Sequence, residues 1–236
     1  MTCRVSVVIP TLDEAERIGA LIATLQREHE LAEIIVADGG SSDGTAALAT
    51  RMGARVITGA RGRGAELCAG AAAAQGEILL FLHADSVFPS GGLTAITAAL
   101  DRAPRAPGGN FRVIFDGGRS FDRWLTGAYA WVRRFALYYG DSGIYVRRAV
   151  YDAIGGIKPM ALMEDWEFVR RLERAGPTIR IDDPPLVTSS RTFAGRRPAA
   201  VIGRLTLIHF LYWLGVSPER LARLWHAPSA TASRRA

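Results

Sequence analysis

The apolar residues of the first hundred positions predict strands and helices in alternation. Apolar runs at 4–10, 33–37, 54–58 and 78–82 are separated by segments with apolar residues at helical spacing. The run at 78–82 is unbroken, which is typical of a strand buried on both faces. The order β-α-β-α-β-α-β predicts an α/β fold with a mostly parallel central sheet flanked by helices.

The alternation breaks after residue 103, so we expect a mixed sheet in the second half. Pro104 and Pro107 punctuate a loop, and the segment 109–115 then resembles a strand. Two further short runs, at 178–181 and 186–189, predict two edge strands.

Two later segments predict helices with unusual apolar surfaces. Residues 120–137 place aromatic side chains opposite arginines, which fits an interfacial membrane helix or one that packs on the core, and we favour the core. Its predicted apolar face holds Phe121, Trp124, Leu125, Ala128, Val132 and Phe135, with Asp122 on the polar face. Residues 199–214 are apolar nearly all round, which predicts a buried groove, a homodimer contact or a membrane surface. This segment is shorter than the roughly 20 residues that a membrane span requires.

The length of 236 residues fits one larger domain. We expect an α/β domain over 1–190, a helical extension packed on it over 191–226, and a disordered tail over 227–236. Cys3 and Cys68 are the only cysteines, and no signal sequence is apparent, so we expect a cytoplasmic protein, with peripheral contact to the inner face of the membrane left open. The net charge of +6 favours phosphate-bearing ligands or an anionic membrane, and no nucleic-acid-binding motif is present.

Acidic side chains follow three predicted strands. Glu14, Asp38 and Asp85 come after the first, second and fourth apolar runs, and a basic glycine loop occupies 61–64. Ligands of open α/β sheets bind beyond the carboxyl ends of the strands. Asp85 could instead cap the helix that begins near Pro89. Three acids with a basic loop favour a site for a phosphorylated, metal-bound ligand.

The ordered set of motifs resembles the family 2 inverting glycosyltransferases of the GT-A (Rossmann-like) fold, over roughly residues 4 to 190. The segments that carry the resemblance are V-V-I-P-T-L-D-E at 7–14, V-A-D-G-G-S-S-D-G-T at 36–45, H-A-D at 83–85, G-D-S-G-I-Y-V-R-R at 140–148 and M-E-D-W-E at 163–167. The fourth of these and the closing S-P-E-R-L-A-R-L are similar to a small bacterial branch, the arsenosugar-biosynthesis-type glycosyltransferases.

The resemblance implies a nucleotide-diphosphate sugar donor, with UDP favoured, and transfer of a hexose. It implies that Asp38 accepts a hydrogen bond from the base, that Asp85 holds Mn²⁺ or Mg²⁺, and that Asp165 is the general base beside Glu164. The residues implied on the donor side are Pro10, Thr11, Glu14, Asp38, Arg61, Arg63, His83, Ala84 and Asp85. Those implied on the acceptor side are Gly140, Asp141 and Ser142.

The chain departs from the family pattern in several places. His83 stands where an acid is expected, and it can ligate Mn²⁺ or point into the core, which we favour. A Q-x-x-R-W motif is absent, which argues against processive polymer synthesis. Arg191, Arg196 and Arg197 could replace some donor contacts of that region.

Other functions remain open on the sequence alone. They are a sugar nucleotidyltransferase, a non-catalytic nucleotide-binding module on a transferase scaffold, and a peripheral membrane module. The acceptor can be a polyprenyl phosphate, a membrane lipid or a soluble small molecule. The segments 120–137 and 199–214 favour a lipid-linked or membrane-proximal acceptor.

Overall fold

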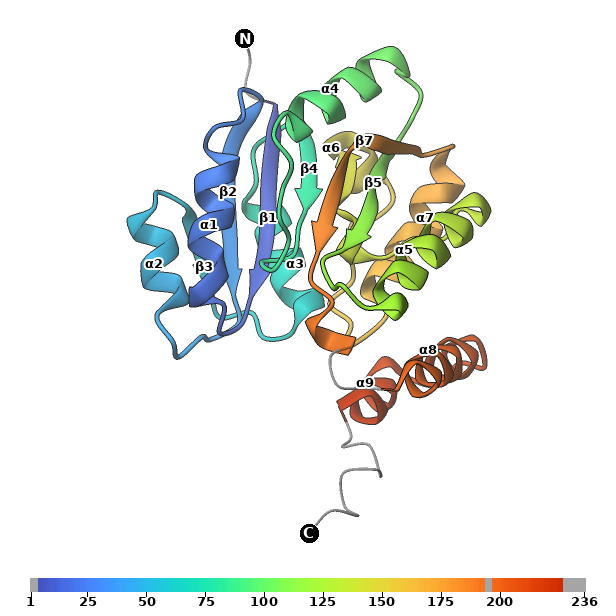
Figure 1. Ribbon diagram of the computed structural model, residues 1–236. Helices are drawn as coiled ribbons and strands as arrows, with labels where there is room; N and C mark the ends of the chain where they lie inside the picture. Colours follow the sequence, from blue (N-terminus) through green and yellow to red (C-terminus); the bar gives the residue numbers. More distant parts are fainter. Residues whose placement is uncertain (1–3, 194–196, 227–236) are drawn as a thin grey trace.

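Seven strands in the described part of the chain form one sheet (Figure 1). The computed structural model describes residues 4–193 and 197–226, so the predicted tail and Arg196 lie outside the described residues. The strands are β1 (Val5–Thr11), β2 (Leu31–Asp38), β3 (Arg55–Thr58), β4 (Ile78–Phe81), β5 (Gly108–Phe115), β6 (Ile144–Arg147) and β7 (Ile179–Thr188).

The strand order is β3-β2-β1-β4-β6-β5-β7. Strands β1 to β4 pair in parallel, whereas β6 is antiparallel to both β4 and β5. Strand β7 runs parallel to β5 at the edge of the sheet. The predicted change from a parallel first half to a mixed second half is therefore confirmed.

Helices cover both faces of the sheet, because the central strands are apolar on both faces. One layer contains α1 (Ala15–Leu25), α2 (Thr45–Arg51) and α4 (Gly92–Arg102), and the other contains α3 (Arg63–Ala73), α6 (Arg148–Ala153) and α7 (Glu164–Ala175). Val7 and Ile9 pack in the first layer, whereas Val8 and Phe81 pack in the second. Alternate side chains of one strand thus enter opposite cores.

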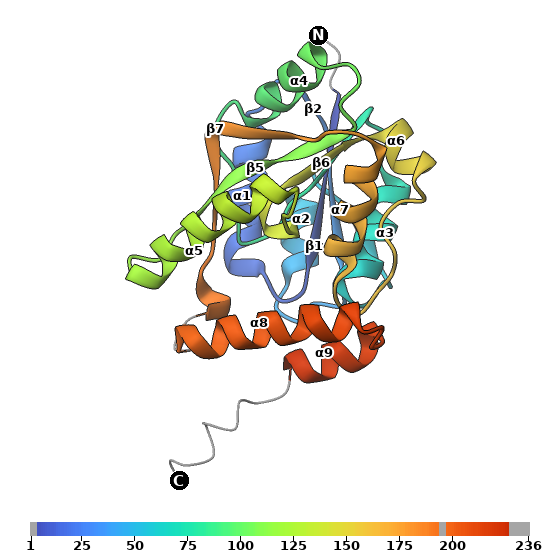
Figure 2. The same ribbon diagram turned by 90° about the vertical axis from the view of Figure 1, so that its right-hand side faces the viewer.

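Three further helices lie near the carboxyl ends of the strands. They are α5 (Ser120–Val132), α8 (Pro198–Trp213) and α9 (Pro218–His226), and Figure 2 shows α8 and α9 beneath the sheet. Val201 of α8 packs with Phe115 of β5 and Leu125 of α5. Ile208, further along α8, packs with Met163 and with Leu221 of α9. Helix α8 therefore spans from the edge of the sheet to the loop that precedes α7.

Two sequence predictions need correction. The two expected edge strands form one strand, β7, because β5 pairs with it on both sides of a register shift between Phe111 and Val113. The helix expected to reach residue 137 ends at Val132, where a 3-10 turn over Arg133–Phe135 follows.

The predicted faces of α5 are also partly wrong. Asp122 is fully buried instead of exposed on the polar face. Its carboxylate is satisfied there by hydrogen bonds from the backbone and side chain of Arg119. Leu125 is buried as expected, but Trp124 and Phe135 are more than half exposed. No helix among residues 4–193 and 197–226 is both long enough and apolar enough to cross a membrane.

Candidate active site

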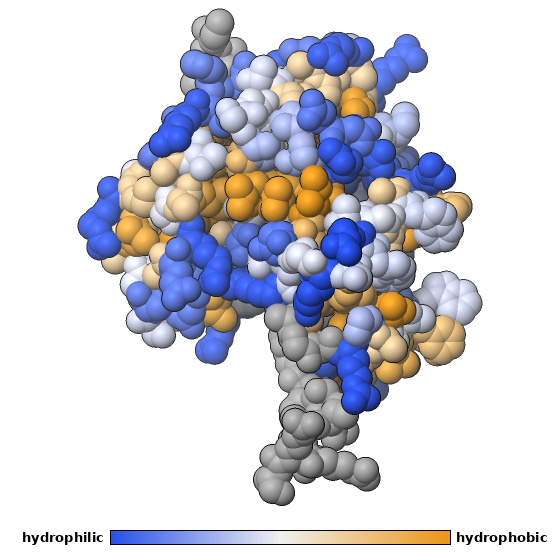
Figure 3. All heavy atoms as spheres, in the orientation of Figure 1, coloured by the Kyte–Doolittle hydropathy of each residue, from blue (hydrophilic) through white to orange (hydrophobic). Residues whose placement is uncertain are grey.

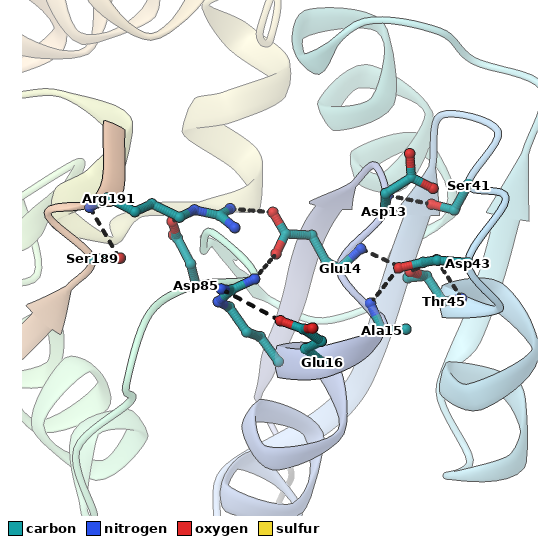
Figure 4. Close-up of polar contacts among 11 residues, drawn as sticks. Asp13, Glu14, Ala15, Glu16, Ser41, Asp43, Thr45, Asp85, Ser189 and Arg191 are labelled. Atoms are coloured by element: carbon teal, nitrogen blue, oxygen red, sulfur yellow. Dashed lines mark hydrogen bonds and ion pairs between the residues drawn. The ribbon is translucent and has the colours of Figure 1, made fainter. Parts of the chain in front are cut away.

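Arg191 joins two of the predicted acids at the carboxyl ends of the strands. Its guanidinium bonds to the carboxylate of Glu14, after β1, and its Nε lies 3.0 Å from Asp85 Oδ2, after β4 (Figure 4). Burial raises the pKa of Asp85, and the charge of Arg191 opposes that rise. The alternative role of Asp85 as a helix cap is wrong, because Glu28 accepts the backbone N–H groups of Gly91 and Leu93 at the start of α4.

Asp38, after β2, is buried at the centre of its own loop. Its carboxylate accepts hydrogen bonds from the backbone of Gly40 and Ser41 at 3.1 and 2.9 Å, and from the hydroxyls of Ser41 and Thr11 at 2.5 and 3.2 Å. Burial by itself would raise the pKa of Asp38, but these hydrogen bonds outweigh it and hold the pKa below its usual range. The loop is therefore already shaped around an ionised carboxylate.

A second cluster forms around Arg63, at the start of α3. Its Nε donates to Glu164, and its Nη2 lies 3.4 Å from Asp165 Oδ2. Glu164 is almost fully buried, and this burial raises its pKa despite the contact with Arg63. Arg61, predicted on the same side, is exposed, and the structure does not bring it into this cluster.

Asp165 is held in place by backbone donors. Its Oδ2 accepts from Gly140 N at 2.9 Å, and its Oδ1 accepts from Trp166 N at 2.7 Å. Burial would raise the pKa of Asp165, but Arg63 and these N–H groups lower it below the usual range. Asp165 is therefore a carboxylate at neutral pH, fixed in orientation.

Asp141 lies close by in a different environment. Its Oδ2 accepts from the Tyr129 hydroxyl at 2.8 Å, whereas its Oδ1 is buried without a hydrogen-bond partner. Burial, together with the charge of Asp165, raises the pKa of Asp141 to about 7. Its neighbour Ser142 turns away, because the Ser142 hydroxyl donates to the Tyr139 carbonyl.

A cavity of about 760 Å³ lies between these clusters and α8. Its lining includes five charged or titratable residues from the strand ends and the two clusters, which we call the polar floor: Arg63, His83, Asp85, Asp141 and Asp165. The remaining predicted site residues lie outside the cavity lining: Pro10, Thr11, Glu14, Asp38, Arg61, Ala84, Gly140, Ser142 and Glu164.

His83 lines this cavity, so the expectation that it points into the core is wrong. Its Nε2 lies 3.4 Å from Arg63 Nη1, at the end of β4 where the chain turns away from the sheet. Burial and the charge of Arg63 lower the pKa of His83 to about 3, so the imidazole is neutral at neutral pH. A neutral ring nitrogen can accept a hydrogen bond or ligate a metal.

The sequence did not single out an aromatic cluster that also lines the cavity. The Tyr139 hydroxyl lies 3.1 Å from His209 Nε2 of α8, and the Trp166 and His209 rings are 5.0 Å apart. These residues are far apart in sequence, and only the position of α8 brings them together. Tyr129, the partner of Asp141, lies within the segment 120–137 and was not predicted as a site residue.

The polar floor fits a divalent cation only together with a phosphorylated ligand. Within the described residues, no three His, Cys, Asp or Glu side chains converge closely enough to hold a metal ion. Mg²⁺ sites, however, commonly combine one or two carboxylates with substrate phosphates. Asp85 supplies one such carboxylate, and the neutral His83 lies on the same floor.

Comparisons with known proteins agree with this architecture. The model of the family described as "Glycosyl transferase family 2" matches residues 6–158. An uncharacterized glycosyltransferase of Mycobacterium tuberculosis is 35% identical over 99 residues, which are 42% of this chain and 44% of the relative. The chain thus matches less than half of the length of this curated relative.

Solved structures share the fold. Glucosyl-3-phosphoglycerate synthase from Mycobacterium tuberculosis, in complex with Mn²⁺, UDP and glucosyl-3-phosphoglycerate, has a TM-score of 0.62 and 21% identity over 90% of this chain and 80% of that one. A mannosyltransferase from Pyrobaculum calidifontis, in complex with GDP-mannose and Mn²⁺, has a TM-score of 0.67 and 19% identity over 96% and 69%. These neighbours confirm the GT-A fold.

Proposed function

Because this chain belongs to glycosyl transferase family 2, we propose that it transfers a sugar from a nucleotide-diphosphate sugar to an acceptor oxygen, with inversion at the anomeric carbon. The observation that carries the proposal is the polar floor. It places Asp165, an ionised and oriented carboxylate, in the same cavity as Asp85 at the carboxyl end of β4. A direct displacement needs these two acids in separate roles and no enzyme nucleophile.

The donor nucleotide is assigned to the loops that follow β1 and β2. The Asp38 loop is preformed, and its serines and backbone groups lie at the sheet edge where α/β proteins bind nucleotides. Two structural neighbours were crystallised with UDP and with GDP-mannose, which supports a nucleotide-sugar donor here. We favour UDP, with Asp38 recognising the base.

Asp85 is the residue proposed to hold Mn²⁺ or Mg²⁺, with phosphate oxygens of the donor completing the site. Such a cation would neutralise the charge that develops on the diphosphate leaving group. Arg191 already neutralises Asp85 and Glu14 in this structure, so the two carboxylates are held close together at the same sheet edge.

Asp165 is proposed as the general base. Its carboxylate takes the proton of the acceptor hydroxyl while that oxygen attacks the anomeric carbon and the bond to the diphosphate breaks. Arg63 and the Gly140 N–H keep the carboxylate ionised and oriented. Glu164 acts through Arg63, which it holds in place from a buried position.

The melting temperature of the purified chain tests the donor site. We expect UDP with Mn²⁺ to raise it by about 5–10 °C at a hundredfold excess over the dissociation constant, because ligand binding to the folded state stabilises it by roughly 2.7 kcal/mol. Asp85→Ala should abolish the metal-dependent part of the shift, whereas Asp152→Ala, at an exposed carboxylate on α6, should keep it. The absence of a shift with UDP or GDP and either metal would contradict the proposal and favour a non-catalytic module.

A further inference from the structure

The lining of the cavity has two chemically different parts. Besides the polar floor, it contains apolar side chains of α5 and α8 that we call the apolar wall: Trp124, Ala128, Ile202, Phe210 and Trp213. A volume of about 760 Å³ is within the range of roughly 300–1,000 Å³ that is usual for small-molecule sites. Because floor and wall belong to one cavity, one ligand can contact both.

The apolar wall is exposed without a ligand. Trp124 is 51% exposed, Phe210 54% and Trp213 81%. Figure 3 shows apolar side chains gathered over α8 and α9 at the lower right of the molecule. Scattered apolar side chains are ordinary on a protein surface, but a contiguous set that continues into a site with titratable groups marks a ligand site.

We propose that the acceptor is an amphiphilic lipid, with a hydroxyl-bearing head at the polar floor and an apolar chain along the wall between α5 and α8. This inference rests on the proposed function, because it places the acceptor oxygen beside Asp165. A sugar-sized polar acceptor would leave Phe210 and Trp213 in water, whereas an apolar chain would cover them.

The charges of the floor favour a hydroxyl head over a phosphate head. Asp85, Asp141 and Asp165 line the cavity, and among the described residues that line it Arg63 is the only arginine or lysine. Arg63 already contacts Glu164 and Asp165, so it has little remaining charge to offer an anion. A neutral hydroxyl avoids repulsion by the carboxylates and gives Asp165 a proton to accept.

The dependence of affinity on chain length tests the inference. The full chain is titrated with monoacylglycerols bearing hexanoyl, octanoyl and decanoyl chains, below their micellar concentrations, and binding is followed by tryptophan fluorescence, since Trp124, Trp166, Trp213 and Trp225 line the cavity. We expect the affinity to rise about threefold to fourfold per added methylene, as for transfer of a methylene out of water. An affinity independent of chain length would overturn the proposal.

A matched pair of variants locates the chain. Phe210→Gln removes an apolar side chain from the cavity wall, and Leu207→Gln removes one that is equally exposed, at 50%, on the same helix but outside the cavity. We expect Phe210→Gln to weaken decanoyl binding about tenfold or more, and Leu207→Gln to leave it unchanged. Equal losses in both variants would overturn the wall as the binding site.

Two further measurements separate the possible failures. Dodecyl phosphate should bind more weakly than a monoacylglycerol of the same chain length, and tighter binding would overturn the hydroxyl head. Both variants should keep the melting-temperature shift with UDP and Mn²⁺, because no donor contact is assigned to either residue. If UDP and Mn²⁺ did not raise the melting temperature of the unsubstituted chain, the proposed function would be contradicted. The dependence of affinity on chain length would still test whether the apolar wall binds an apolar chain.

Discussion

Two parts of this molecule hold their carboxylates in opposite ways. Asp38, at the end of β2, accepts four hydrogen bonds from neighbouring residues of the loops after β1 and β2. Asp141, in the cavity between the sheet and α8, accepts one, from Tyr129, and leaves its second oxygen buried without a partner. The pKa of Asp38 is lowered accordingly, and the pKa of Asp141 is raised to about 7.

This difference matches the two tasks proposed for the sites. The hydrogen bonds that hold the Asp38 loop are already made. Such a loop can bind a ligand that does not vary, such as a nucleotide, with little reorganisation. A cavity with an unpaired buried oxygen and an exposed apolar wall retains binding capacity that only a ligand can satisfy. Under the proposed function, the donor side is preformed and the acceptor side is completed by its substrate.

The largest effect is expected at the proposed base. Asp165→Asn keeps the size of the side chain, and its single amide oxygen can accept from either Gly140 N or Trp166 N, which donate to different oxygens of Asp165, but it cannot take a proton. We expect kcat for sugar transfer to fall about 10²–10⁴-fold, the usual contribution of general-base catalysis. The melting shift with UDP and Mn²⁺ should remain, because the donor site is separate.

Asp152→Asn, an exposed carboxylate on α6, serves as the control for the loss of one negative charge. Near-normal transfer by Asp165→Asn would rule out its role as base. Loss of nucleotide binding in the same variant would contradict the proposal that the donor and the acceptor are bound by separate residues.

A second effect concerns the pH dependence of stability through Asp141. In the unfolded chain this carboxyl loses its proton near pH 3.8, whereas in the folded chain it keeps the proton until about pH 7. The folded state therefore binds more protons between these values, so the free energy of unfolding falls as pH rises through this window, by at most about 4 kcal/mol.

Urea unfolding at pH 5 and at pH 8 measures this fall. Asp141→Asn cannot titrate, so its free energy of unfolding should decline less between the two pH values than that of the unsubstituted chain. Tyr129→Phe removes the hydrogen bond that lowers the pKa of Asp141, and it should steepen the decline. If the free energy of unfolding declined equally between the two pH values in all three proteins, Asp141 would be titrating like an ordinary solvated carboxylate.

Much of the fold follows from the sequence because the first half obeys simple rules. Apolar runs separated by helical periods give parallel strands, and parallel strands bring their carboxyl ends to one edge. The proximity of Glu14 and Asp85, both bound to Arg191, is the direct outcome. The second half is less predictable, because β6 enters the sheet antiparallel between β4 and β5, and local pattern does not encode strand order.

The candidate site shows the same division. The acids were identified because their positions follow strand ends, but their partners were not, since Arg63 and Glu164 are 101 residues apart and meet only through the packing of α3 against the start of α7. The sequence predicts Asp122 on the polar face because helical periodicity shows on which face a residue lies. It does not show that the Asp122 side chain accepts from Arg119 at the start of the helix. The prediction that His83 points into the core was wrong because, in the sequence alone, an aromatic ring that follows a buried strand resembles a core residue.

The smallest expected effect tests whether the loop after β2 is tightly packed, with an exposed glycine of α5 as the control. A Cβ on Gly39 would collide with the Glu66 carboxylate, whose Oε1 accepts from Gly62 N at 3.0 Å, whereas a Cβ on Gly127 of α5 would meet no atom within 4 Å. Gly39→Ala should lower the free energy of unfolding by about 1–3 kcal/mol through overpacking. Gly127→Ala should raise it by up to about 1 kcal/mol through helix propensity. If urea unfolding gave both variants the same stability, the Glu66 carboxylate would have moved aside, and the loop after β2 would tolerate a side chain as readily as the exposed face of α5.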